Sequence, residues 1–470
     1  MRAATAAGLA AEEEQAMVAA LRATLRGEVI DRAHPDYDEA RRVWNGLIDR
    51  HPTAIARCAG TADVVEAVRV AREHRPVVSI RGGGHQVAGS ALCDDGLVID
   101  LSGMKGVHVD ATGRTVRAQA GVTWGELDRE TQLFGLATTG GEVSTTGIAG
   151  FSLGGGLGAT QRAFGLACDN VRSVEIVTAD GMVRTASREE HRDLWWAVRG
   201  GGRGLGVVTS FEFDLHPLGP EVAVATVFYP YDDAERVVRA WRDVAAAAPE
   251  TVAPEVGLWS VPPDPTIPVE LHGNKVVLVA GLYAGAADEA GPALAPLREL
   301  GTPLLDASGT LPYVDAQRQL DPLFATGQRY YWKSLFLEQL SDEAVSRLLE
   351  RDAERPTPQS LIVLRTLGGA IDRMPAADSA YAHRGARHNL SVDGTWTDPE
   401  LDGEVIGWVR STWESLRPFS TGGVYVNFSG LGEEADELRA AVQGASQQRL
   451  EEIRAAYDPR GLFDAAARHP

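Results

Sequence analysis

Three glycine-rich segments, at 82–84, 147–156 and 200–206, constrain the fold of this chain more than any other feature. Glycine has no Cβ atom, so it adopts backbone conformations that other residues avoid and lets the chain approach a ligand closely. Successive backbone N–H groups in such loops form concavities that bind anions. The pattern therefore predicts a fold in which several loops surround one long, phosphate-bearing ligand.

The first glycine-rich loop runs from Arg81 to Ser90 and follows an apolar stretch that predicts a short strand at 76–80. Arg81 would add a positive charge beside bound phosphates. His85 carries the only ring nitrogens in this loop, and a neutral imidazole there could attack the 8α-methyl carbon of a flavin whose pyrophosphate the glycines hold. The alternative interpretation is a glycine turn with an incidental histidine.

The second segment matches two familiar motifs in the wrong context. Gly154-x-Gly156-x-x-Ala159 followed by Asp180 imitates a Rossmann motif, but no clear apolar strand precedes it, and Asp180 lies at the expected corner of a hairpin. The Gly-x-Ser-x-Gly motif centred on Ser152 imitates the nucleophile elbow of a hydrolase, but three glycines would begin the helix that should follow. A serine hydrolase therefore stays a minor alternative.

Length and charge narrow the classes of function. The chain has 470 residues, 44% of them hydrophobic, so two domains with a cleft between them are expected. A net charge of −20 argues against partners such as nucleic acid or an anionic membrane surface. No long apolar stretch occurs and residues 1–27 read as an amphipathic helix, so a cytoplasmic protein is expected. The three cysteines are far apart, and neither a disulfide framework nor a metal site is predicted.

The order of the predicted elements changes near residue 220. Before it come strands that include two hairpins, expected at 96–101, 106–118, 173–185 and 207–215. Beyond it strands alternate with helices, which predicts an α+β domain whose helices cover one face of a sheet. These strands are expected at 222–229, 276–283, 330–336 and 361–366, and the helices at 232–247, 287–300 and 342–354. A further strand is expected at 423–428.

Several motifs occur together and in order between residues 40 and 470. They include Arg-Gly-Gly-Gly-His at 81–85, Gly-Leu-Val-Ile-Asp-Leu at 96–101, Leu-Trp-Trp-Ala-Val-Arg-Gly-Gly-Gly at 194–202, Tyr-x-Asn-Phe at 425–428 and Tyr-Asp-Pro at 457–459. In this combination the chain resembles the FAD-linked oxidases of the berberine bridge enzyme type, within the wider vanillyl-alcohol-oxidase-like group. The resemblance implies an α+β fold. A PCMH-type FAD-binding domain of two α/β subdomains would be joined to a substrate domain whose mainly antiparallel sheet roofs the flavin.

The resemblance also implies where the domains begin and end. A helical extension would occupy residues 1–44 and the FAD-binding domain residues 45–220. The substrate domain would span residues 221–415, and a C-terminal segment, 416–470, would return to the FAD-binding domain.

By the same resemblance, His85 carries a covalent bond to the 8α position of FAD. Many relatives add a second bond from a cysteine, but Val143 stands at that position here, so attachment through His85 alone is expected. Cys168 reads as a buried structural thiol. The other residues expected around the cofactor are Arg81, Gly82, Gly83, Gly84, Gln86, Val87, Gly89, Ser90, Val143, Thr145, Thr146, Gly147, Ile148, Gly150, Gly154, Gly155, Gly156, Val207 and Asn427.

Five residues are candidates for catalysis. Tyr425 and Asn427 would share one face of the predicted C-terminal strand and lie against flavin and substrate. A phenol of ordinary pKa is a poor base, so Tyr425 would need a positive neighbour. Tyr331, Lys333 and Arg365 stand at spacing-two positions of the substrate-domain strands and could point into the cleft, where Lys333 or Arg365 would supply that charge.

The expected function is that of an FAD-dependent oxidase. It would take a hydride from a small organic substrate, such as an alcohol, amine or phenolic secondary metabolite, and pass the electrons to O2; a homodimer is one option for its assembly. Arg373 stands where plant relatives have a glutamate base, which argues against a plant-type carboxylate mechanism. Two alternatives stay open: a flavin-containing resistance protein that binds a drug-like metabolite with little turnover, and a dehydrogenase that uses another acceptor.

Overall fold

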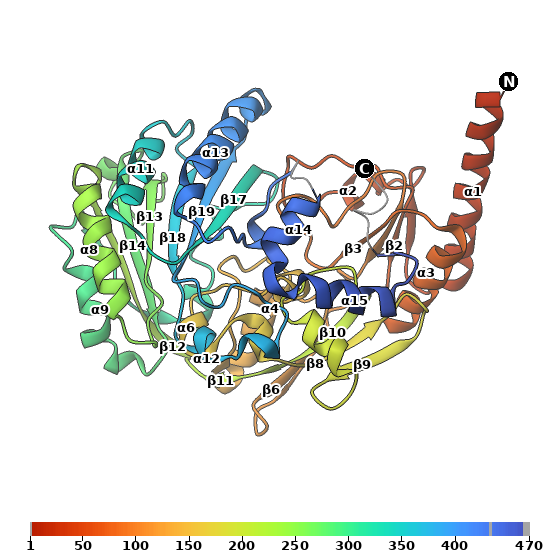
Figure 1. Cartoon of the computed structure of the whole chain (residues 1–470), viewed down its shortest axis with the longest axis horizontal. Helices are drawn as coiled ribbons and strands as arrows, with labels where there is room; N and C mark the ends of the chain where they lie inside the picture. Colours follow the sequence, from red (N-terminus) through yellow and green to blue (C-terminus); the bar gives the residue numbers. More distant parts are fainter. Residues whose placement is uncertain (1, 432–434, 464–470) are drawn as a thin grey trace.

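The computed structural model describes residues 2–431 and 435–463, whose strands form four sheets in two halves (Figure 1). Three sheets lie in the half formed mainly by residues before 218, and one large sheet forms the other half. The mixed α+β architecture is the predicted one. Helix α1 (Arg2–Thr24) projects at the outer edge of the first half.

The first sheet has the order β1-β2-β4-β3, with β2 (Ala54–Arg57), β4 (Leu97–Asp100) and β3 (Val78–Arg81) parallel and β1 (Val29–Asp31) antiparallel at the edge. Helix α3 (Thr61–His74) connects β2 to β3 and buries an apolar stripe that includes Val64 and Val68. The first glycine-rich loop leaves the carboxyl end of β3, which is where ligands bind in sheets of this kind.

The second sheet is antiparallel, in the order β5-β6-β10-β8-β9. Its two hairpins are the predicted ones, and Asp180 lies in the turn between β8 and β9, next to Gly181 with φ of 80°. A hairpin corner is incompatible with the role of a Rossmann acid. The strands are β5 (Val107–Asp110), β6 (Thr115–Gln119), β8 (Val171–Val177), β9 (Val183–Ser187) and β10 (Val207–Asp214), and β7 (Leu136–Ala137) pairs separately with β11 (His216–Pro217).

Short helices connect these strands and carry the second and third glycine-rich segments. They are α2 (Tyr37–Ala40), α4 (Trp124–Thr131), α5 (Ile148–Leu153), α6 (Gln161–Phe164) and α7 (Arg192–Val198).

The large sheet is antiparallel, in the order β15-β12-β14-β13-β18-β19-β17, with β16 also pairing with β12. Its strands are β12 (Glu221–Pro230), β13 (Glu255–Ser260), β14 (Lys275–Tyr283), β15 (Leu305–Asp306), β16 (Gly309–Pro312), β17 (Arg329–Leu337), β18 (Leu361–Thr366) and β19 (His388–Trp396). Four helices cover one face, as predicted, and leave the other toward the first half (Figure 1): α8 (Ala234–Ala247), α9 (Gly291–Arg298), α11 (Asp342–Ala353) and α13 (Asp402–Leu416).

Two short helices, α10 (Tyr313–Ala316) and α12 (Ala370–Arg373), lie between strands of this half. Two more follow it in the chain, α14 (Ala435–Gln443) and α15 (Gln447–Tyr457). Helix α15 contacts α7, and its Leu450 lies in the hydrophobic core of the first half.

The strand predicted at 423–428 is wrong. This segment pairs with β17 only briefly, through Thr421 N to Phe336 O at 2.9 Å and Phe336 N to Gly423 O at 3.1 Å. The Ser334 hydroxyl then accepts the hydrogen bond of Tyr425 N, and the chain turns into a 3₁₀ helix at Val426–Phe428. A side-chain hydroxyl that captures a backbone N–H ends the strand ladder at that point.

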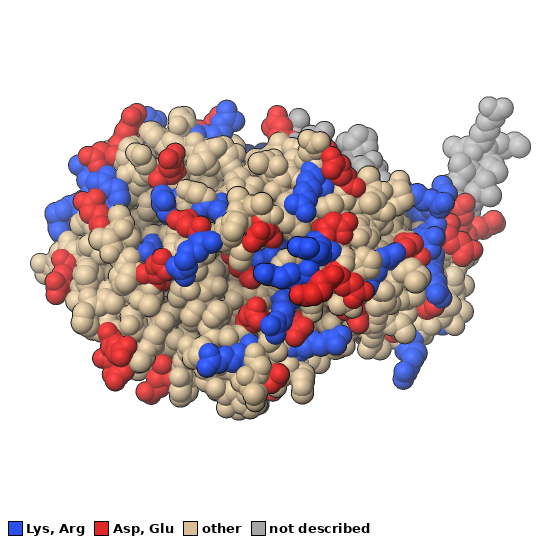
Figure 2. Space-filling view, turned by 60° about the horizontal axis from the view of Figure 1, so that its bottom comes forward, with Lys and Arg blue, Asp and Glu red and all other residues tan. Residues whose placement is uncertain are grey.

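Acidic and basic side chains are interspersed on the face shown in Figure 2, in spite of the large net negative charge. Within residues 2–431 and 435–463, none of the helices combines the length and the apolar character that crossing a bilayer requires.

Candidate active site

The first two glycine-rich segments meet where β3 ends, and the third contacts the second at the other end of α5. A Cβ atom on Gly83 would lie 2.5 Å from the backbone nitrogen of Gly147, so the first two loops touch through their glycines. The third segment joins them through Gly202 N, which donates to Leu153 O at 2.9 Å. The absence of side chains thus serves the packing of loop against loop as well as the approach of a ligand.

The backbone of the first loop is a set of unused donors. The N–H groups of residues 82 to 86 donate to no group among the described residues, although the loop lies beside the buried side chains of Val87 and Ile148. Buried or half-buried N–H groups normally have partners. Five consecutive free donors next to glycines fit the pyrophosphate of a dinucleotide, as the sequence predicts.

His85 lies within this row of donors. Its Nε2 lies 2.7 Å from Thr145 Oγ1 and its Nδ1 lies 3.4 Å from Thr146 Oγ1. One face of the ring stacks on Trp44, at 4.4 Å between centroids. Protein atoms crowd the imidazole although part of its surface stays open, and this burial lowers the pKa of His85 to about 3. The ring is therefore neutral near pH 7, the state that a nitrogen nucleophile requires.

The role expected for Arg81 is wrong. Its guanidinium turns away from the glycine loop, where it pairs with Asp100 of β4 and donates to the carbonyl oxygen of Ala40. Because a fully buried carboxylate compensates its charge, Arg81 supports the loop through these contacts and offers no free charge to a phosphate.

The other residues expected around the cofactor fall into two groups. The side chains of Val87, Ile148 and Val207 are buried in hydrophobic cores, so these residues could reach a ligand only through their backbone. Thr145 and Gly150 are exposed, and a Cβ atom on Gly150 would meet nothing within 4 Å. Half-buried or buried in the same region are Gly82, Gly83, Gly84, Gln86, Gly89, Ser90, Val143, Thr146, Gly147, Gly154, Gly155 and Gly156.

Tyr425 and Asn427 come together although they do not lie on a strand. Tyr425 Oη accepts hydrogen bonds from Gly156 N at 3.1 Å and Leu157 N at 3.0 Å, and from Asn427 Nδ2 at 2.8 Å. Burial raises the pKa of Tyr425 to about 12, and these three donors oppose the rise. The positive neighbour expected for this phenol is thus replaced by backbone N–H groups and an amide.

Tyr331 and Lys333 do not point into the cleft. Tyr331 Oη accepts a hydrogen bond from Arg410 Nε at 2.9 Å, and Lys333 Nζ lies 4.0 Å from the centre of the Trp413 ring, both partners on α13. The register explains the error. Lys333 stands opposite Val392, which stands opposite Ile362, and this row faces the helices.

Arg365 belongs to the other row, with Asn389 and Phe336, on the face that the helices leave free. Its Nη2 lies 3.3 Å from Glu142 Oε2, and its Nη1 donates to Ser391 Oγ at 3.0 Å. Of the three candidate sheet residues, Arg365 alone lies on the face that the helices leave free.

Four functional candidates were missed. Glu142, Glu255 and Asp393 surround Arg365, and Trp44 stacks on His85. In the sequence, Asp393 stands in a Ser-x-Asp alternation. In the structure, all nine residues of its strand, β19, are buried. Trp44 precedes all the recognisable motifs and carried no signal.

The alternatives based on Ser152 and Cys168 lose support. Ser152 is fully buried, and its hydroxyl has no hydrogen-bond partner among the described residues, so no base activates it. Cys168 is fully buried as expected, and burial raises the pKa of its thiol.

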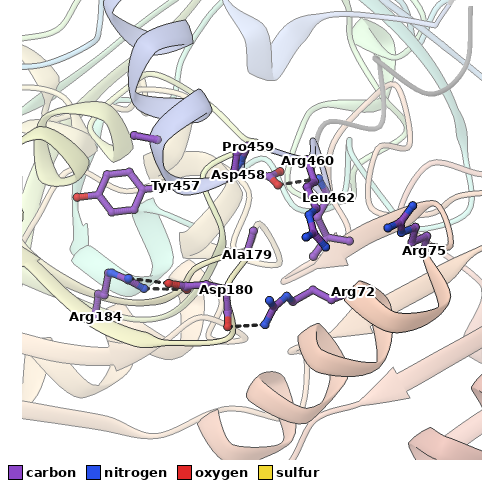
Figure 3. Close-up of a pocket in the computed structure, with 11 residues that line it drawn as sticks. Arg72, Arg75, Ala179, Asp180, Arg184, Tyr457, Asp458, Pro459, Arg460 and Leu462 are labelled. Atoms are coloured by element: carbon purple, nitrogen blue, oxygen red, sulfur yellow. Dashed lines mark hydrogen bonds and ion pairs between the residues drawn. The ribbon is translucent and has the colours of Figure 1, made fainter.

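A separate hollow of about 800 Å³ lies between the end of α3, the β8–β9 turn and the segment after α15 (Figure 3). Arg72, Arg184 and Tyr457 line it, and Arg184 is paired with Asp180. None of its lining residues belongs to the glycine-rich segments.

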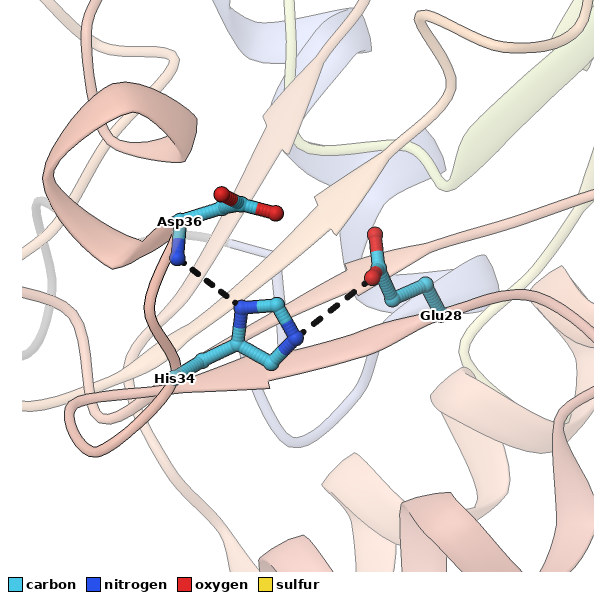
Figure 4. A group of neighbouring side chains, drawn as sticks. All are labelled: Glu28, His34 and Asp36. Carbon is cyan, nitrogen blue, oxygen red and sulfur yellow. Dashed lines mark hydrogen bonds and ion pairs between the residues drawn. The ribbon is translucent and has the colours of Figure 1, made fainter.

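Glu28, His34 and Asp36 form a cluster near the first sheet (Figure 4). His34 Nδ1 accepts a hydrogen bond from Asp36 N at 3.1 Å, and His34 Nε2 lies 3.5 Å from Glu28 Oε1. Both ring nitrogens are thus engaged within the protein, and Glu28 also pairs with Arg57 at 2.9 Å.

Comparison with known proteins agrees with this geometry. Residues 52–187 match the family model of an FAD binding domain. An uncharacterized FAD-linked oxidoreductase of Bacillus subtilis is 30% identical over 446 residues, which cover 93% of this chain and 96% of that protein.

Two solved structures share the fold. The 6-hydroxy-D-nicotine oxidase of Arthrobacter nicotinovorans is 26% identical with a TM-score of 0.81, covering 93% of this chain and 96% of that one. BBE-like 1 of Physcomitrella patens is 22% identical with a TM-score of 0.85, covering 95% of this chain and 97% of that one. With the matched FAD-binding domain, the relative from Bacillus subtilis shows that the chain belongs to the FAD-linked oxidoreductases, and the chain has the fold of the BBE-like 1 structure.

Proposed function

We propose that this protein is an oxidase that carries FAD covalently on His85 alone and uses O2 to oxidise a small organic molecule. The observation that carries the proposal is a neutral imidazole within a row of five free N–H donors. Bound FAD would accept a hydride from a substrate C–H bond, so that overall the substrate loses two hydrogens and O2 becomes H2O2.

We infer the tautomer of His85 from the two threonines beside it. Thr145 Oγ1 makes the shorter contact, 2.7 Å from Nε2, whereas Thr146 Oγ1 lies 3.4 Å from Nδ1. A proton on Nε2 that is donated to Thr145 leaves the lone pair of Nδ1 for bond formation. Since Val143 stands in place of a cysteine, no second thiol attachment is proposed there.

Tyr425 is proposed to take part in the transfer of the proton that the substrate loses when its hydride is transferred. Its Oη accepts three hydrogen bonds, while its own proton has no acceptor among the described residues. The same three donors would stabilise the oxygen if it became anionic, and they thereby offset part of the cost that burial adds to the loss of its proton. Asn427 and the backbone of Gly156 and Leu157 are the positioning groups.

An aromatic cluster keeps water from this region. Trp44 stacks on Tyr330 at 3.8 Å, and Trp332 meets Trp44 at 5.4 Å and Phe428 at 5.5 Å. Large aromatic rings in contact exclude solvent and strengthen the electrostatic interactions of the groups that they enclose.

Acid precipitation tests the attachment. The purified holoenzyme should leave its yellow colour in the protein pellet, and mass spectrometry should find the flavin on the peptide that contains His85. The His85→Ala variant should release all its flavin into the supernatant, whereas His108→Ala, which changes an exposed histidine on β5, should keep it. Flavin in the wild-type supernatant would refute a covalent bond.

Reoxidation tests the acceptor. Enzyme that has been photoreduced without oxygen should be reoxidised by air within seconds and yield one H2O2 per flavin. Slow reoxidation by air with fast reoxidation by a dye would instead assign a dehydrogenase. A flavin that no candidate substrate bleaches would favour a binding protein.

A further inference from the structure

A buried cluster of charged groups lies on the face of the large sheet that the helices leave free. Arg365 of β18 is at its centre, with its Nη2 3.3 Å from Glu142 and its Nε 3.8 Å from Glu255 of β13. Ser391 links it to β19, because its Oγ accepts from Arg365 and donates to Asp393 Oδ2 at 3.1 Å. Three strands and the loop before Val143 thus bring together one cation and three carboxyl groups.

The cluster borders the proposed flavin site. The guanidinium of Arg365 lies 5.0 Å from the centre of the Phe428 ring. The Phe428 ring contacts Tyr425 at 4.9 Å and Trp332 at 5.5 Å between ring centres. Trp332 in turn contacts Trp44, the ring that stacks on His85. Glu142 and Glu255 keep 17% and 18% of their side-chain surface exposed, so the cluster is not fully closed to solvent.

The carboxyl groups outnumber the cation. Although burial disfavours its charge, the carboxylates around it raise the pKa of Arg365, and Arg365 and Glu142 form a balanced ion pair. Burial and the nearby Glu142 raise the pKa of Glu255 well above its ordinary value. Burial raises the pKa of Asp393 to about 7, against the opposing effect of Arg365. Two acids in excess of the ion pair are therefore held wholly or partly protonated.

Several polar atoms of this face lack partners. Glu255 Oε1, Asp393 Oδ1, Trp332 Nε1 and both amide atoms of Asn389 form no hydrogen bond among the described residues. Asn389 is fully buried and Asp393 is 1% exposed. Unsatisfied polar groups in the interior are costly, so a concentration of them beside two partly exposed carboxyl groups indicates a ligand that completes their hydrogen bonds.

We propose that this cluster is the recognition site for a positively charged nitrogen of the substrate, which Glu255 and Asp393 hold beside the Arg365–Glu142 pair. The inference rests on the proposed function and names the substrate class, an amine bound as its ammonium ion. A cation restores the ionised form of the two excess acids and donates to their free oxygens. An anion would meet only the guanidinium, whose charge Glu142 already balances.

Three phenols that carry a cationic, a neutral or an anionic substituent of similar size test the part of the proposal that depends on charge. The probes are (3-hydroxyphenyl)trimethylammonium, its neutral isostere 3-tert-butylphenol and the anion 3-hydroxybenzenesulfonate. Binding is followed in the holoenzyme through the flavin spectrum and, independently, through tryptophan fluorescence. At pH 8 the cation should bind about tenfold or more tightly than the neutral isostere, and the sulfonate should bind most weakly.

Variants assign this preference to the cluster. Asp393→Asn should bring the affinities of the cation and of the neutral isostere to within about threefold of each other, and Glu255→Gln should act in the same direction. Glu338→Gln, which neutralises an exposed carboxylate at the end of the same sheet, is the control and should keep the wild-type preference.

The pH dependence has a defined sign. Arg365, Glu142 and, across Arg365, Glu255 are the charged groups around Asp393. Because a bound cation favours ionised Asp393, binding should release protons, and the affinity for the cation should rise with pH through about 7. The Asp393→Asn variant should lose most of this slope.

Equal or tighter binding of the neutral isostere or the sulfonate, or an unchanged preference in Asp393→Asn, would overturn the proposal. The flavin content and attachment of each preparation are measured first. A preparation with covalent flavin but no preference for the cation contradicts this inference alone, whereas one without covalent flavin contradicts the proposed function.

Discussion

Two buried tyrosines give a matched test of how hydrogen bonds stabilise the active site. Tyr425 and Tyr381 belong to one hydrophobic cluster, and both are almost completely buried. Tyr425 Oη accepts from Gly156 N, Leu157 N and Asn427 Nδ2, whereas Tyr381 Oη has no partner among the described residues. Replacing each with phenylalanine removes the same atom from nearly the same environment.

The expected effects differ in size and in sign. Tyr425→Phe leaves two buried backbone N–H groups without an acceptor, at about 1–2 kcal/mol each, so the free energy of unfolding should fall by about 2–4 kcal/mol. The loss at Asn427 is smaller because its Nδ2 also donates to Phe151 O at 3.1 Å. Tyr381→Phe removes an unsatisfied hydroxyl and should be neutral or stabilising by up to about 1 kcal/mol.

Thermal unfolding of holoenzymes with equal flavin content measures the difference. A chain of this length gains roughly 1 kcal/mol/K of entropy on unfolding, so Tyr425→Phe should lower the Tm by about 2–4 °C, while Tyr381→Phe leaves it within about 1 °C. Equal losses in the two variants would refute the reasoning, because they would show that ring packing, common to both, governs stability here. A Tyr425→Phe variant of wild-type Tm would mean that its three donors find other acceptors.

Three further predictions concern the fold and the loops. Burial raises the pKa of Asp128 to about 7. Above pH 4 the folded protein keeps a proton that the unfolded chain has released, so the stability that this group contributes is present at low pH and is lost as the pH rises to 7. Asp128→Asn should therefore raise the Tm more at pH 8 than at pH 5 in parallel melts. Gly83→Ala should abolish flavin binding or folding, because its Cβ atom would lie 2.5 Å from Gly147 N. Gly150→Ala, in a helix with free space around it, should fold with a gain in stability of about 0.5–1 kcal/mol and should lose flavin only if FAD contacts this residue. Absorbance at 450 nm measures flavin binding and circular dichroism measures folding. Asp321 accepts hydrogen bonds from the backbone N–H and the hydroxyl of Ser144, the residue before Thr145. Asp321→Ala should therefore slow the covalent attachment of flavin several-fold at an unchanged Tm. An unchanged time course for the formation of acid-stable flavin would contradict this role.

Local features were readable from the chain alone. The glycine loop that follows β3 and the hairpin at Asp180 depend on residues close in sequence, and the structure has both where they were expected. Glycine at a close approach and Asp-Gly at a tight turn act through local backbone geometry, which few long-range contacts override.

The catalytic face was decided by tertiary structure. Alternation shows which residues of one strand share a side, but only the pairing of β17 with β19 and β18 determines that Lys333 faces the helices and Arg365 the cleft. The same holds for Arg81, which Asp100 of a neighbouring strand draws away from the loop.

The sequence by itself determined the family, the cofactor-binding loop and the residue proposed to hold the flavin. Tertiary structure decided which polar groups form the proposed recognition site, because Glu142, Glu255, Arg365 and Asp393 are separated by up to 251 positions and meet only when the sheet closes over the first half. The physical reason is that burial and electrostatic coupling depend on distance in space, whereas a motif records only distance along the chain.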